Sequence, residues 1–424
     1  MANRDDEYYD RGGRRPSHRD DRYRDDMRSS GRGRDSRSRR DYDDYDERPR
    51  RGSRYDDPRR GGQPSRSGSS SRNGKKNNKA MILLVSEIAV AMLLLVAAYH
   101  IFFKMGATKV GRVDLDEQAI NESISDAASD NEHMKEYPNI ALFGVDSTKG
   151  QLDKKTRSDS IIICSINNKS GEIKLCSVYR DTWLNLSDDT YNKCNAAYSY
   201  GGPDQAIAML NMNLDMDIKD CYTIGFRGLK DVVDALGGVE IDVPENVVKH
   251  LNNYQITMAK DLKLKDSEWS QLSGSGLQRL NGLQAVAYCR VRYTQGGDFD
   301  RAARQREVIQ ACLKEAKTKK VSELEDVANS ILKESYTTLK SDDILKLLKN
   351  VPKYEIVDQG GFPTEENDMR KTGRVGKQSI VAPVDLESNV KWLHGFLFND
   401  TEYTVSEEVK KYSQKISSDT GLSR

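Results

Sequence analysis

The sequence predicts an α/β fold, a three-layer α/β/α domain in which a mixed central sheet lies between two layers of helices. Strand patterns alternate along the chain with helical ones, as in NIALFGVDS (139–147) and QAIAMLNMNL (205–214). Several strands are joined by hairpin turns, which make neighbouring strands antiparallel and the sheet mixed. The chain beyond residue 137 is also long enough to bury one large core.

The first predicted hairpin is SIIICSINNKSGEIKLCSVYRDTWL (160–184), where two β-rich segments flank a turn that contains glycine. The sequence GGPD predicts the start of a helix over 201–214, because proline is tolerated in a first helical turn. A glycine pair should end the helix RGLKDVVDALGG (227–238). The strand VEIDVPENV (239–247) should stop at its proline.

The segment LNGLQAVAYCRVRY (280–293) is predicted to run from a short helix into a strand, and DFDRAARQREVIQACLKEA (298–316) to be a helix. The remaining elements are helices over 321–335, 341–351 and 386–398, and strands near 221–226, 354–360 and 379–384.

The chain has 424 residues, 31% of them charged, and a formal net charge of +1. Residues 1–79 contain 24 Lys and Arg and 16 Asp and Glu, with almost no apolar side chains besides Tyr. Such a segment cannot bury a core that offsets its chain entropy, so we expect a disordered tail.

The next segment, AMILLVSEIAVAMLLLVAAYHIFF (80–103), has the length and composition of a transmembrane helix, with Glu87 and His100 near its ends. Six Lys and Arg precede it within twenty residues and three follow it, so the N-terminus should remain cytoplasmic. We therefore expect a single-pass type II protein of the cell membrane, with the chain after the anchor extracellular.

Beyond the anchor, residues 104–137 are predicted to be a polar extracellular tether, 138–399 a folded domain, and 400–424 a frayed polar tail. The six cysteines all follow the anchor: Cys164, Cys176, Cys194, Cys221, Cys289 and Cys312. Cys164 and Cys176 flank the turn NNKSG and could face each other as a disulfide, or fill the sheet core as thiols. No cysteine or histidine spacing suggests zinc.

An unusual density of arginine marks YCRVRYTQGGDFDRAARQR (288–306). If its first part is a strand, Arg290 and Arg292 project from one face, about 7 Å apart. Arg301 and Arg304 share a face of the following helix. Two pairs of guanidinium groups would then point at one place, which suits the oxygens of a diphosphate.

The alternative for this segment is a solvated surface on which Asp298 and Asp300 neutralise the arginines. A second cluster favours a binding site. Asp146 ends a strand, Asp159 begins the next one, and Arg180 follows the hairpin partner of that strand, so the three should share one edge of the sheet.

The same edge should also hold Arg157, next to the two carboxylates Asp146 and Asp159. Mg²⁺ or Mn²⁺ suits such a site, because Mg²⁺ prefers one or two carboxylates together with phosphate oxygens of a substrate. Lys193 is either a further phosphate contact or an exposed lysine, and Asp181 could hold Arg180 in place.

Taken together, these motifs resemble the LytR–CpsA–Psr family over roughly residues 138–315. The motifs that carry the resemblance are, in order, FGVDS, TRSDS, SVYRDTW, KCNAAYSYGGPDQA, FRGLKDVVDALGGVEIDVP, LNGLQAVAYCRVRY and GDFDRAARQ. The family's stretch GDFGR reads GDFDR here, with Asp300 at the second glycine, and its KINAAY reads KCNAAY.

The resemblance implies an enzyme that transfers a glycopolymer, such as teichoic acid or capsule, from a polyprenyl-diphosphate carrier to peptidoglycan, with pyrophosphatase side activity. It implies Asp146 and Asp159 as ligands of Mg²⁺. The implied diphosphate-binding residues are Arg157, Arg180, Arg290, Arg292, Arg301 and Gln305, and we add Lys193 as the further candidate. The implied catalytic residues are Asp159, Arg180, Arg290 and Arg292.

In the implied reaction a peptidoglycan hydroxyl attacks the phosphorus that bears the glycan, with Asp159 as a candidate base. The family fold also implies an apolar tunnel for the lipid, which the helices at 205–214 and 229–238 could line if they are not ordinary core. One alternative is a non-catalytic polyprenyl-phosphate-binding scaffold of wall assembly. Another is a membrane-bound transcriptional attenuator.

The N-terminal tail alternates Arg with Asp and Tyr and has no helix-turn-helix pattern. We therefore expect it to contact anionic lipid or cell-wall assembly proteins, and no nucleic acid.

Overall fold

The computed structural model of the chain describes residues 115–147, 152, 155–331 and 334–423. The predicted cytoplasmic tail and the membrane-spanning helix fall outside these ranges. Within them, the helices are all too short or too polar to cross a membrane.

The central sheet has six strands in the order β10-β3-β2-β1-β6-β9. β1 pairs antiparallel with β2 and parallel with β6, so the sheet is mixed, as predicted. The strands are β1 (Asn139–Val145), β2 (Ser158–Ile166), β3 (Glu172–Val178), β6 (Asp220–Ile224), β9 (Ser335–Thr337) and β10 (Glu355–Phe362).

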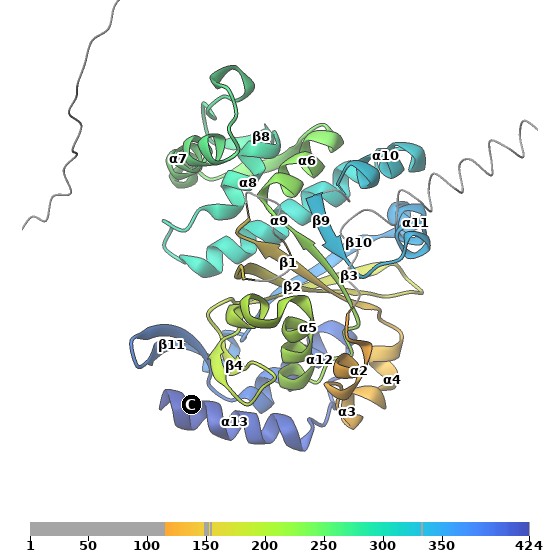
Figure 1. Cartoon of the computed structure of the whole chain (residues 1–424), viewed down its shortest axis with the longest axis vertical. Helices are drawn as coiled ribbons and strands as arrows, with labels where there is room; N and C mark the ends of the chain where they lie inside the picture. Colours follow the sequence, from red (N-terminus) through yellow and green to blue (C-terminus); the bar gives the residue numbers. More distant parts are fainter. Residues whose placement is uncertain (1–114, 148–151, 153–154, 332–333, 424) are drawn as a thin grey trace, which may run out of the picture. The chain divides into compact units, whose positions relative to one another are not determined.

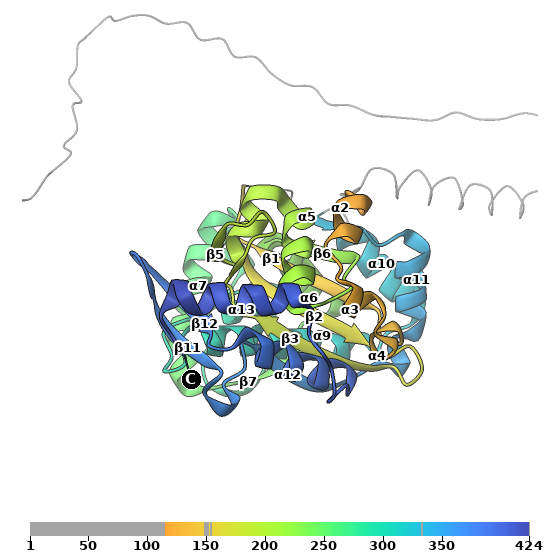
Figure 2. The same ribbon diagram turned by 90° about the horizontal axis from the view of Figure 1, so that it is seen from below.

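Helices cover both faces of this sheet (Figures 1 and 2). One layer consists of α2 (Glu117–Glu122), α3 (Asp126–Ser129), α4 (Glu132–Lys135), α5 (Asn195–Leu214), α12 (Leu386–Phe398) and α13 (Glu407–Thr420). The opposite layer consists of α6 (Phe226–Leu236), α8 (Gly282–Arg290), α9 (Asp298–Ala316), α10 (Val321–Ile331) and α11 (Ser341–Asn350), and α7 (Glu245–Asp261) packs on α8. Three two-stranded sheets complete the described fold: β4 (Trp183–Asn185) with β5 (Tyr191–Lys193), β7 (Val239–Val243) with β8 (Gly276–Leu280), and β11 (Arg370–Val375) with β12 (Gln378–Pro383).

The side chains of β2 show why both faces need a helical layer. Ile161 and Ile163 are buried in the core beneath α5 and α12, whereas Ile162 lies in a separate core on the opposite face, against α9. Successive side chains of a strand point to opposite faces, so an apolar run such as this one requires cover on both. The predicted three-layer arrangement follows from this pattern.

The same alternation decides the state of two cysteines. In the β2–β3 hairpin Cys176 is opposite Ile163, and Cys164 is opposite Leu175. The two cysteines are therefore one residue out of register and lie on opposite faces of the sheet. The disulfide alternative is wrong for this pair, and all six cysteines are free thiols.

Helix α8 corrects the strand predicted up to Tyr293, because the helix continues to Arg290. It starts with a capping box, in which Asn281 accepts from the amide of Gln284 and the Gln284 side chain accepts from the amide of Asn281. Residues 282–289 are all buried. A helix buried on every side has no polar face and therefore no amphipathic helical pattern. The alternation of apolar and charged residues around Arg290 and Val291 was for this reason interpreted as a strand.

Residues 115–137, predicted to be part of a polar tether, fold onto the domain instead. Their helices α2, α3 and α4 bury Ile120, Ala128 and Met134 in the core beneath the sheet. Asp116, Ser125 and Asn131 cap the three helices. The polar composition reflects these caps and the exposed faces, while one apolar side chain in each short helix provides the attachment.

The predicted frayed tail is also wrong. Helix α13 packs against α5, α12 and the β11–β12 ribbon, and its Val409 and Ile416 are fully buried. Tyr412 lies between them and is half-buried, which gives one apolar stripe on an otherwise polar helix. The Ser406 hydroxyl caps the first turn, and the folded domain therefore extends past residue 399.

Helix α5 begins six residues before the GGPD motif, at Asn195. Gly202 has φ 71° and ψ −154°, a conformation that suits glycine, and it kinks the helix just before Pro203. The motif therefore starts the second half of a bent helix.

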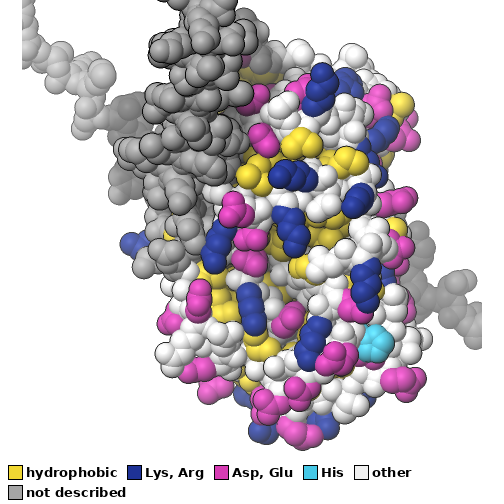
Figure 3. All heavy atoms as spheres, turned by 90° about the vertical axis from the view of Figure 1, so that its right-hand side faces the viewer, with side chains coloured by type: hydrophobic (Ala, Val, Ile, Leu, Met, Phe, Trp, Pro, Cys, Tyr) yellow, Lys and Arg dark blue, Asp and Glu magenta, His cyan; other side chains and the backbone are white. Residues whose placement is uncertain are grey.

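On the face that carries α10 and α11, Lys and Arg side chains alternate with Asp and Glu, and hydrophobic side chains appear in the hollows between them (Figure 3). Interspersed charges of both signs are typical of a solvated surface.

Replacing Ile416 by Ala should lower the free energy of unfolding by about 2–5 kcal/mol, because it leaves a cavity between α13 and the domain. Urea unfolding would measure this difference. Lys411→Ala is the matched control on the exposed face of the same helix and should change the free energy by less than about 0.5 kcal/mol. Equal effects of the two substitutions would mean that α13 does not belong to the cooperative core.

Candidate functional site

Three strand ends meet at one edge of the central sheet. Asp146 directly follows β1, and Val145 is paired with Ser158, so Asp159 of the antiparallel strand β2 lies at the same edge. Arg180 follows the end of β3, which is antiparallel to β2 and reaches this edge too. The predicted edge is therefore present.

The carboxylate of Asp159 is the centre of a charge cluster at this edge. It accepts a hydrogen bond from Arg180 (Nη1–Oδ1 2.7 Å) and one from Arg292 (Nη2–Oδ2 3.2 Å). Arg301 of α9 completes the set, with its Nη1 3.7 Å from Oδ2 and its Nη2 donating to the Asp159 carbonyl oxygen at 3.1 Å. One carboxylate thus draws together guanidinium groups from three separate parts of the chain.

Asp298, at the start of α9, provides a second carboxylate to the same three arginines. Its carboxylate oxygens lie 3.0 Å from Arg301 Nη2, 3.2 Å from Arg180 Nε and 3.6 Å from Arg292 Nε. The solvated-surface alternative does not fit this arrangement, because the Arg301 side chain is only 4% exposed. Arg180, Arg292 and Arg301 therefore form a bridged cluster at the edge of the sheet, in which the carboxylates of Asp159 and Asp298 connect the guanidinium groups.

Electrostatics within the cluster keep Asp159 ionised. Burial alone raises the pKa of the Asp159 carboxyl, but Arg180, Arg301 and Arg292 outweigh it and hold the pKa below its usual value. Burial, together with the like charges of Arg180 and Arg292, lowers the pKa of Arg301 to about 10. Arg301 therefore remains protonated at neutral pH.

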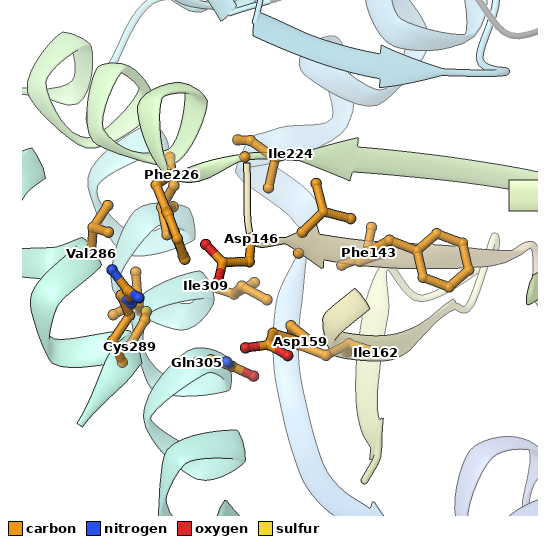
Figure 4. A pocket seen from close by; sticks show the side chains of 18 of the residues that line it. Phe143, Asp146, Asp159, Ile162, Ile224, Phe226, Val286, Cys289, Gln305 and Ile309 are labelled. Atoms are coloured by element: carbon orange, nitrogen blue, oxygen red, sulfur yellow. The ribbon is translucent and has the colours of Figure 1, made fainter. Parts of the chain in front are cut away.

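A pocket of about 460 Å³ opens beside this cluster, between the sheet and the helices α6, α8 and α9. Figure 4 shows Asp146, Asp159 and Gln305 directed into the same space. Six of the predicted site residues line it: Asp146, Asp159, Arg290, Arg292, Arg301 and Gln305.

The rest of the pocket lining is mostly apolar. It includes Leu142, Ile162, Ile224, Phe226, Leu229, Val232, Val286 and Ile309. Of the two helices expected to line an apolar tunnel, α6 contributes Leu229 and Val232, whereas α5 lies on the opposite face of the sheet and contributes core residues. The site thus combines a charged end with an apolar interior.

Arg290 lies on a different wall from the other arginines. Its guanidinium group is over the ring of Phe226 (4.3 Å to the centroid) and near that of Tyr254 (5.5 Å). Among the described residues no carboxylate forms an ion pair with it. Because α8 ends at Arg290, Arg290 and Arg292 diverge and approach the pocket from two directions, instead of projecting from one strand face.

Three predicted phosphate contacts are not in the lining of this pocket: Arg157, Arg180 and Lys193. Lys193 of β5 forms an ion pair with Asp181 (3.1 Å), and Asp181 lies 3.9 Å from Arg180, so Lys193 belongs to the outer part of the same chain of charges. Arg157 precedes β2 and is exposed. Arg180 itself reaches the site through Asp159 and Asp298.

Arg304 does not point into the pocket, contrary to the expected pairing with Arg301. It is 7% exposed and donates to the Val291 carbonyl oxygen and the Thr294 hydroxyl, which fixes the segment between α8 and α9. Arg301 and Arg304 share one face of α9, as the helical spacing predicted. The two side chains nevertheless extend in different directions: Arg301 reaches the sheet, and Arg304 reaches the segment between α8 and α9.

Asp300, where the sequence departs from the family pattern, also stabilises this segment. Its carboxylate accepts from the Thr294 hydroxyl (2.6 Å) and the Gly296 amide (3.0 Å). A Cβ atom at position 296 would lie 2.1 Å from Asp300 Oδ1, so a larger residue there would displace the Asp300 carboxylate. The added charge therefore ties the loop and does not pair with Arg301.

Arg370 is a residue of this site that the sequence did not reveal. It lies in β11, and its guanidinium group is 4.0 Å from the ring centroid of Phe299 and donates to the Tyr179 hydroxyl at 3.0 Å. Tyr179 and Phe299 also contact each other edge to face at 4.6 Å. Tyr179 directly precedes Arg180, and Phe299 directly follows Asp298. The contacts of Arg370 with these two rings therefore fix the two chain segments that carry the cluster. No motif marks Arg370, which is distant in sequence.

The sequence profile of the LytR_cpsA_psr family matches residues 102–380. The chain belongs to this family. The match includes every residue of the charge cluster and Arg370.

Curated relatives include the polyisoprenyl-teichoic acid–peptidoglycan teichoic acid transferase TagU of Bacillus cereus, 33% identical over 214 residues, which are 50% of this chain and 63% of TagU. The corresponding TagV of Bacillus subtilis is 35% identical over 187 residues, 42% of this chain and 44% of TagV. The chain thus matches less than two thirds of the length of either relative.

A crystal structure from Enterococcus faecalis, described as a transcriptional regulator, superposes with a TM-score of 0.52 at 21% identity, over 69% of this chain and 97% of that one. At this identity the likeness shows the shared mixed α/β fold.

Replacing Arg370 by Ala should weaken the binding of inorganic pyrophosphate about ten-fold, because Tyr179 and Phe299 lose the group that aligns Arg180 with Asp298. Titration calorimetry would measure the affinity. Arg370→Lys keeps a cation between the rings and should recover part of the loss. Arg374→Ala, an exposed arginine of the same strand, is the control; an equal loss in that variant would point to a general charge effect and not to positioning.

Proposed function

We propose that this chain transfers a glycopolymer, such as teichoic acid or capsule, from a polyprenyl-diphosphate carrier to peptidoglycan. The observation that carries the proposal is the bridged arginine cluster at the mouth of an apolar pocket. A polyprenyl diphosphate has the matching form, with a doubly phosphorylated head and an apolar chain. Membership of the family and the names of the relatives TagU and TagV support the same substrates.

The arginine cluster can bind a diphosphate while its ion pairs with Asp159 and Asp298 remain intact. Each guanidinium group has five N–H donors in a planar fork, and the contacts to Asp159 and Asp298 use only some of them. The carboxylates fix the orientation of the forks before the ligand arrives, so the side-chain entropy is already lost. Phosphate oxygens would then bind to preorganised donors.

Charge balance at the mouth favours a divalent cation. The mouth has four positive and three negative side chains: Arg180, Arg290, Arg292, Arg301, Asp146, Asp159 and Asp298. A diphosphate diester has one negative charge on each phosphate, which exceeds the single net positive charge of the side chains. We therefore propose Mg²⁺, or Mn²⁺, as the cofactor that makes up the difference.

The residues present fit such an ion in part. Asp146 is exposed and directed into the pocket, and Asp159 has its carboxylate beside the same space. No cluster of three or more metal-ligating side chains occurs among the described residues, so phosphate oxygens and water would complete the coordination. Bound there, the ion would neutralise charge on the diphosphate.

In the proposed reaction a hydroxyl of peptidoglycan attacks the phosphorus that bears the glycan, and polyprenyl phosphate leaves. Arg180, Arg292 and Arg301 would spread the charge of the transferring phosphoryl group, and Arg290 would approach it from the opposite wall. Water in place of the hydroxyl gives the pyrophosphatase side reaction. Asp159 is a poor general base, since three guanidinium groups hold its pKa low. We assign it to orienting the arginines and leave the hydroxyl proton to a phosphate oxygen.

We further propose that the chain is a single-pass membrane protein with this domain outside the cell, where membrane and peptidoglycan are both within reach. The scaffold alternative requires binding without cleavage. One relative, 30% identical over 244 residues, is named biofilm regulatory protein A, of Streptococcus mutans. The preorganised arginine cluster favours the enzyme.

Replacing Arg290 or Arg292 by Ala should reduce transfer about 100-fold or more, because each removes a charge-stabilising contact from the transferring phosphoryl group. The measurement is the transfer of labelled polymer from a polyprenyl-diphosphate donor to peptidoglycan in Mg²⁺, with circular dichroism to confirm folding. Arg374→Ala should retain the wild-type rate.

Wild-type turnover in either variant would show that the arginine cluster is misassigned. If the wild-type chain binds the lipid-linked donor but never cleaves it in Mg²⁺, the scaffold function holds instead. Removing the divalent cation with EDTA should stop transfer, and unchanged transfer in EDTA would refute the proposed cofactor.

A further inference from the structure

The short segment 291–297 connects α8 to α9 and brings Arg292 to the pocket mouth. We call it the mouth segment. Its first end is fixed, because α8 continues to Arg290 and Arg304 donates to the Val291 carbonyl oxygen at 2.8 Å. The Arg292 side chain is 39% exposed, which makes it the most exposed of the three cluster arginines. Water weakens its ion pairs, so its position depends also on the backbone that carries it.

Asp300 fixes the other end of the mouth segment. One oxygen of its carboxylate, Oδ2, accepts from the Thr294 hydroxyl at 2.6 Å and from the Gly296 amide at 3.0 Å. Arg304 donates to the same hydroxyl at 3.1 Å. The Gly297 amide donates to the Thr294 carbonyl oxygen at 3.0 Å. Thr294, two residues beyond Arg292, is thus tied to the start of α9 through its side chain and its backbone.

The contacts of Asp300 differ from those of an ordinary capping residue. An acidic side chain in the third position of a helix commonly accepts from the amide of the N-cap residue. Here the N-cap residue is Gly297, and Asp300 reaches past it to two residues that precede the helix. Asp300 also lies outside the pocket lining, where the carboxylates paired with arginines are those of Asp159 and Asp298.

The fixed mouth segment is a property of this chain. Glycine, which occupies position 300 in the family pattern GDFGR, has no side chain and could make neither hydrogen bond. A carboxylate at this place therefore has a consequence for Arg292 that the family pattern does not include.

We propose that Asp300 is a positioning residue that holds Arg292 at a fixed place across the mouth from Arg290, and thereby lets the site distinguish a diphosphate from a monophosphate. The inference rests on the proposed function. Arg290 and Arg292 approach the pocket from two directions, so the two phosphates of a diphosphate can contact both guanidinium groups, while a single phosphate contacts one of them. This selection requires a fixed separation between the two groups.

The selection has a role in turnover, because the proposed donor is a diphosphate and the departing carrier is a monophosphate. When the phosphoryl group is transferred, the carrier loses one of its two arginine contacts. With Arg292 held in place, the remaining phosphate cannot regain that contact. The product then binds more weakly than the donor and leaves the site.

The test compares farnesyl diphosphate with farnesyl monophosphate. Their Kd values for the full chain in detergent with Mg²⁺ are measured by titration calorimetry, and the readout is the ratio of the two. The wild-type chain should favour the diphosphate about ten-fold or more. Asp300→Ala should lower this ratio to about two- to three-fold by weakening the diphosphate alone, because Arg292 regains conformational freedom.

Asp300→Asn is the conservative variant and should keep the wild-type ratio. Both hydrogen bonds reach one oxygen of Asp300, and the single carbonyl oxygen of an amide has two lone pairs that can accept them. Asp342→Ala is the matched control, since Asp342 is an exposed acidic residue in the first turn of α11. It should leave the ratio unchanged. In an Arg292→Ala chain, Asp300→Ala should lower the ratio no further, because the residue that it positions is absent.

A second measurement needs no ligand. Trypsin cleaves after arginine, so the rate of cleavage after Arg292, followed by mass spectrometry, reports how often the mouth segment opens. Asp300→Ala should speed this cleavage several-fold, and Asp300→Asn and Asp342→Ala should leave it unchanged. Circular dichroism confirms that each variant is folded.

The other outcomes overturn the assignment. Equal weakening of both lipids in Asp300→Ala would make Asp300 a residue that only stabilises α9. A reduced ratio in Asp300→Asn would mean that its charge acts on the bound phosphates directly. Unchanged cleavage in Asp300→Ala would show that Asp300 does not hold Arg292. A wild-type chain that binds neither lipid would instead refute the proposed function, and the cleavage rates would still decide whether Asp300 fixes the mouth segment.

Discussion

Asp159 makes contacts that the rest of the site depends on, because three guanidinium groups cannot lie together in a poorly solvated place without a negative charge between them. Arg180 comes from the end of β3, Arg292 from the segment after α8, and Arg301 from α9. Each could adopt many side-chain conformations alone. The carboxylate of Asp159, helped by Asp298, selects one arrangement and holds two layers of the domain together at the sheet edge.

The architecture explains why the charged cluster adjoins an apolar pocket. Strands β1 and β2 end at the cluster, and their side chains on one face, Leu142 and Ile162, line the pocket. On the other face Phe143 and Ile161 belong to the large core beneath α5. Helices α6, α8 and α9 leave space over the first face. The β11–β12 ribbon supports the cluster from outside, through Arg370 and through the Val381 amide, which donates to the Asp181 carbonyl oxygen.

Local patterns predicted several elements well. The helices at α9 and α12 have the predicted bounds, since each has a polar first turn and an apolar stripe of helical period. Errors occurred where the local pattern was ambiguous. Helix α8 is buried on all sides, so its apolar residues do not recur with the helical period. Helix α13 was predicted to be a frayed tail because its apolar stripe consists of only three residues.

The sequence by itself determined the chemistry at each position and the sheet edge where Asp146, Asp159 and Arg180 meet, because strand ends and hairpin turns are local properties. Tertiary structure alone decided which arginines face the pocket. Arg301 and Arg304 share a helical face, yet one reaches Asp159 and the other Val291. Such choices depend on contacts between residues far apart in the chain, and on burial, which no local spacing encodes.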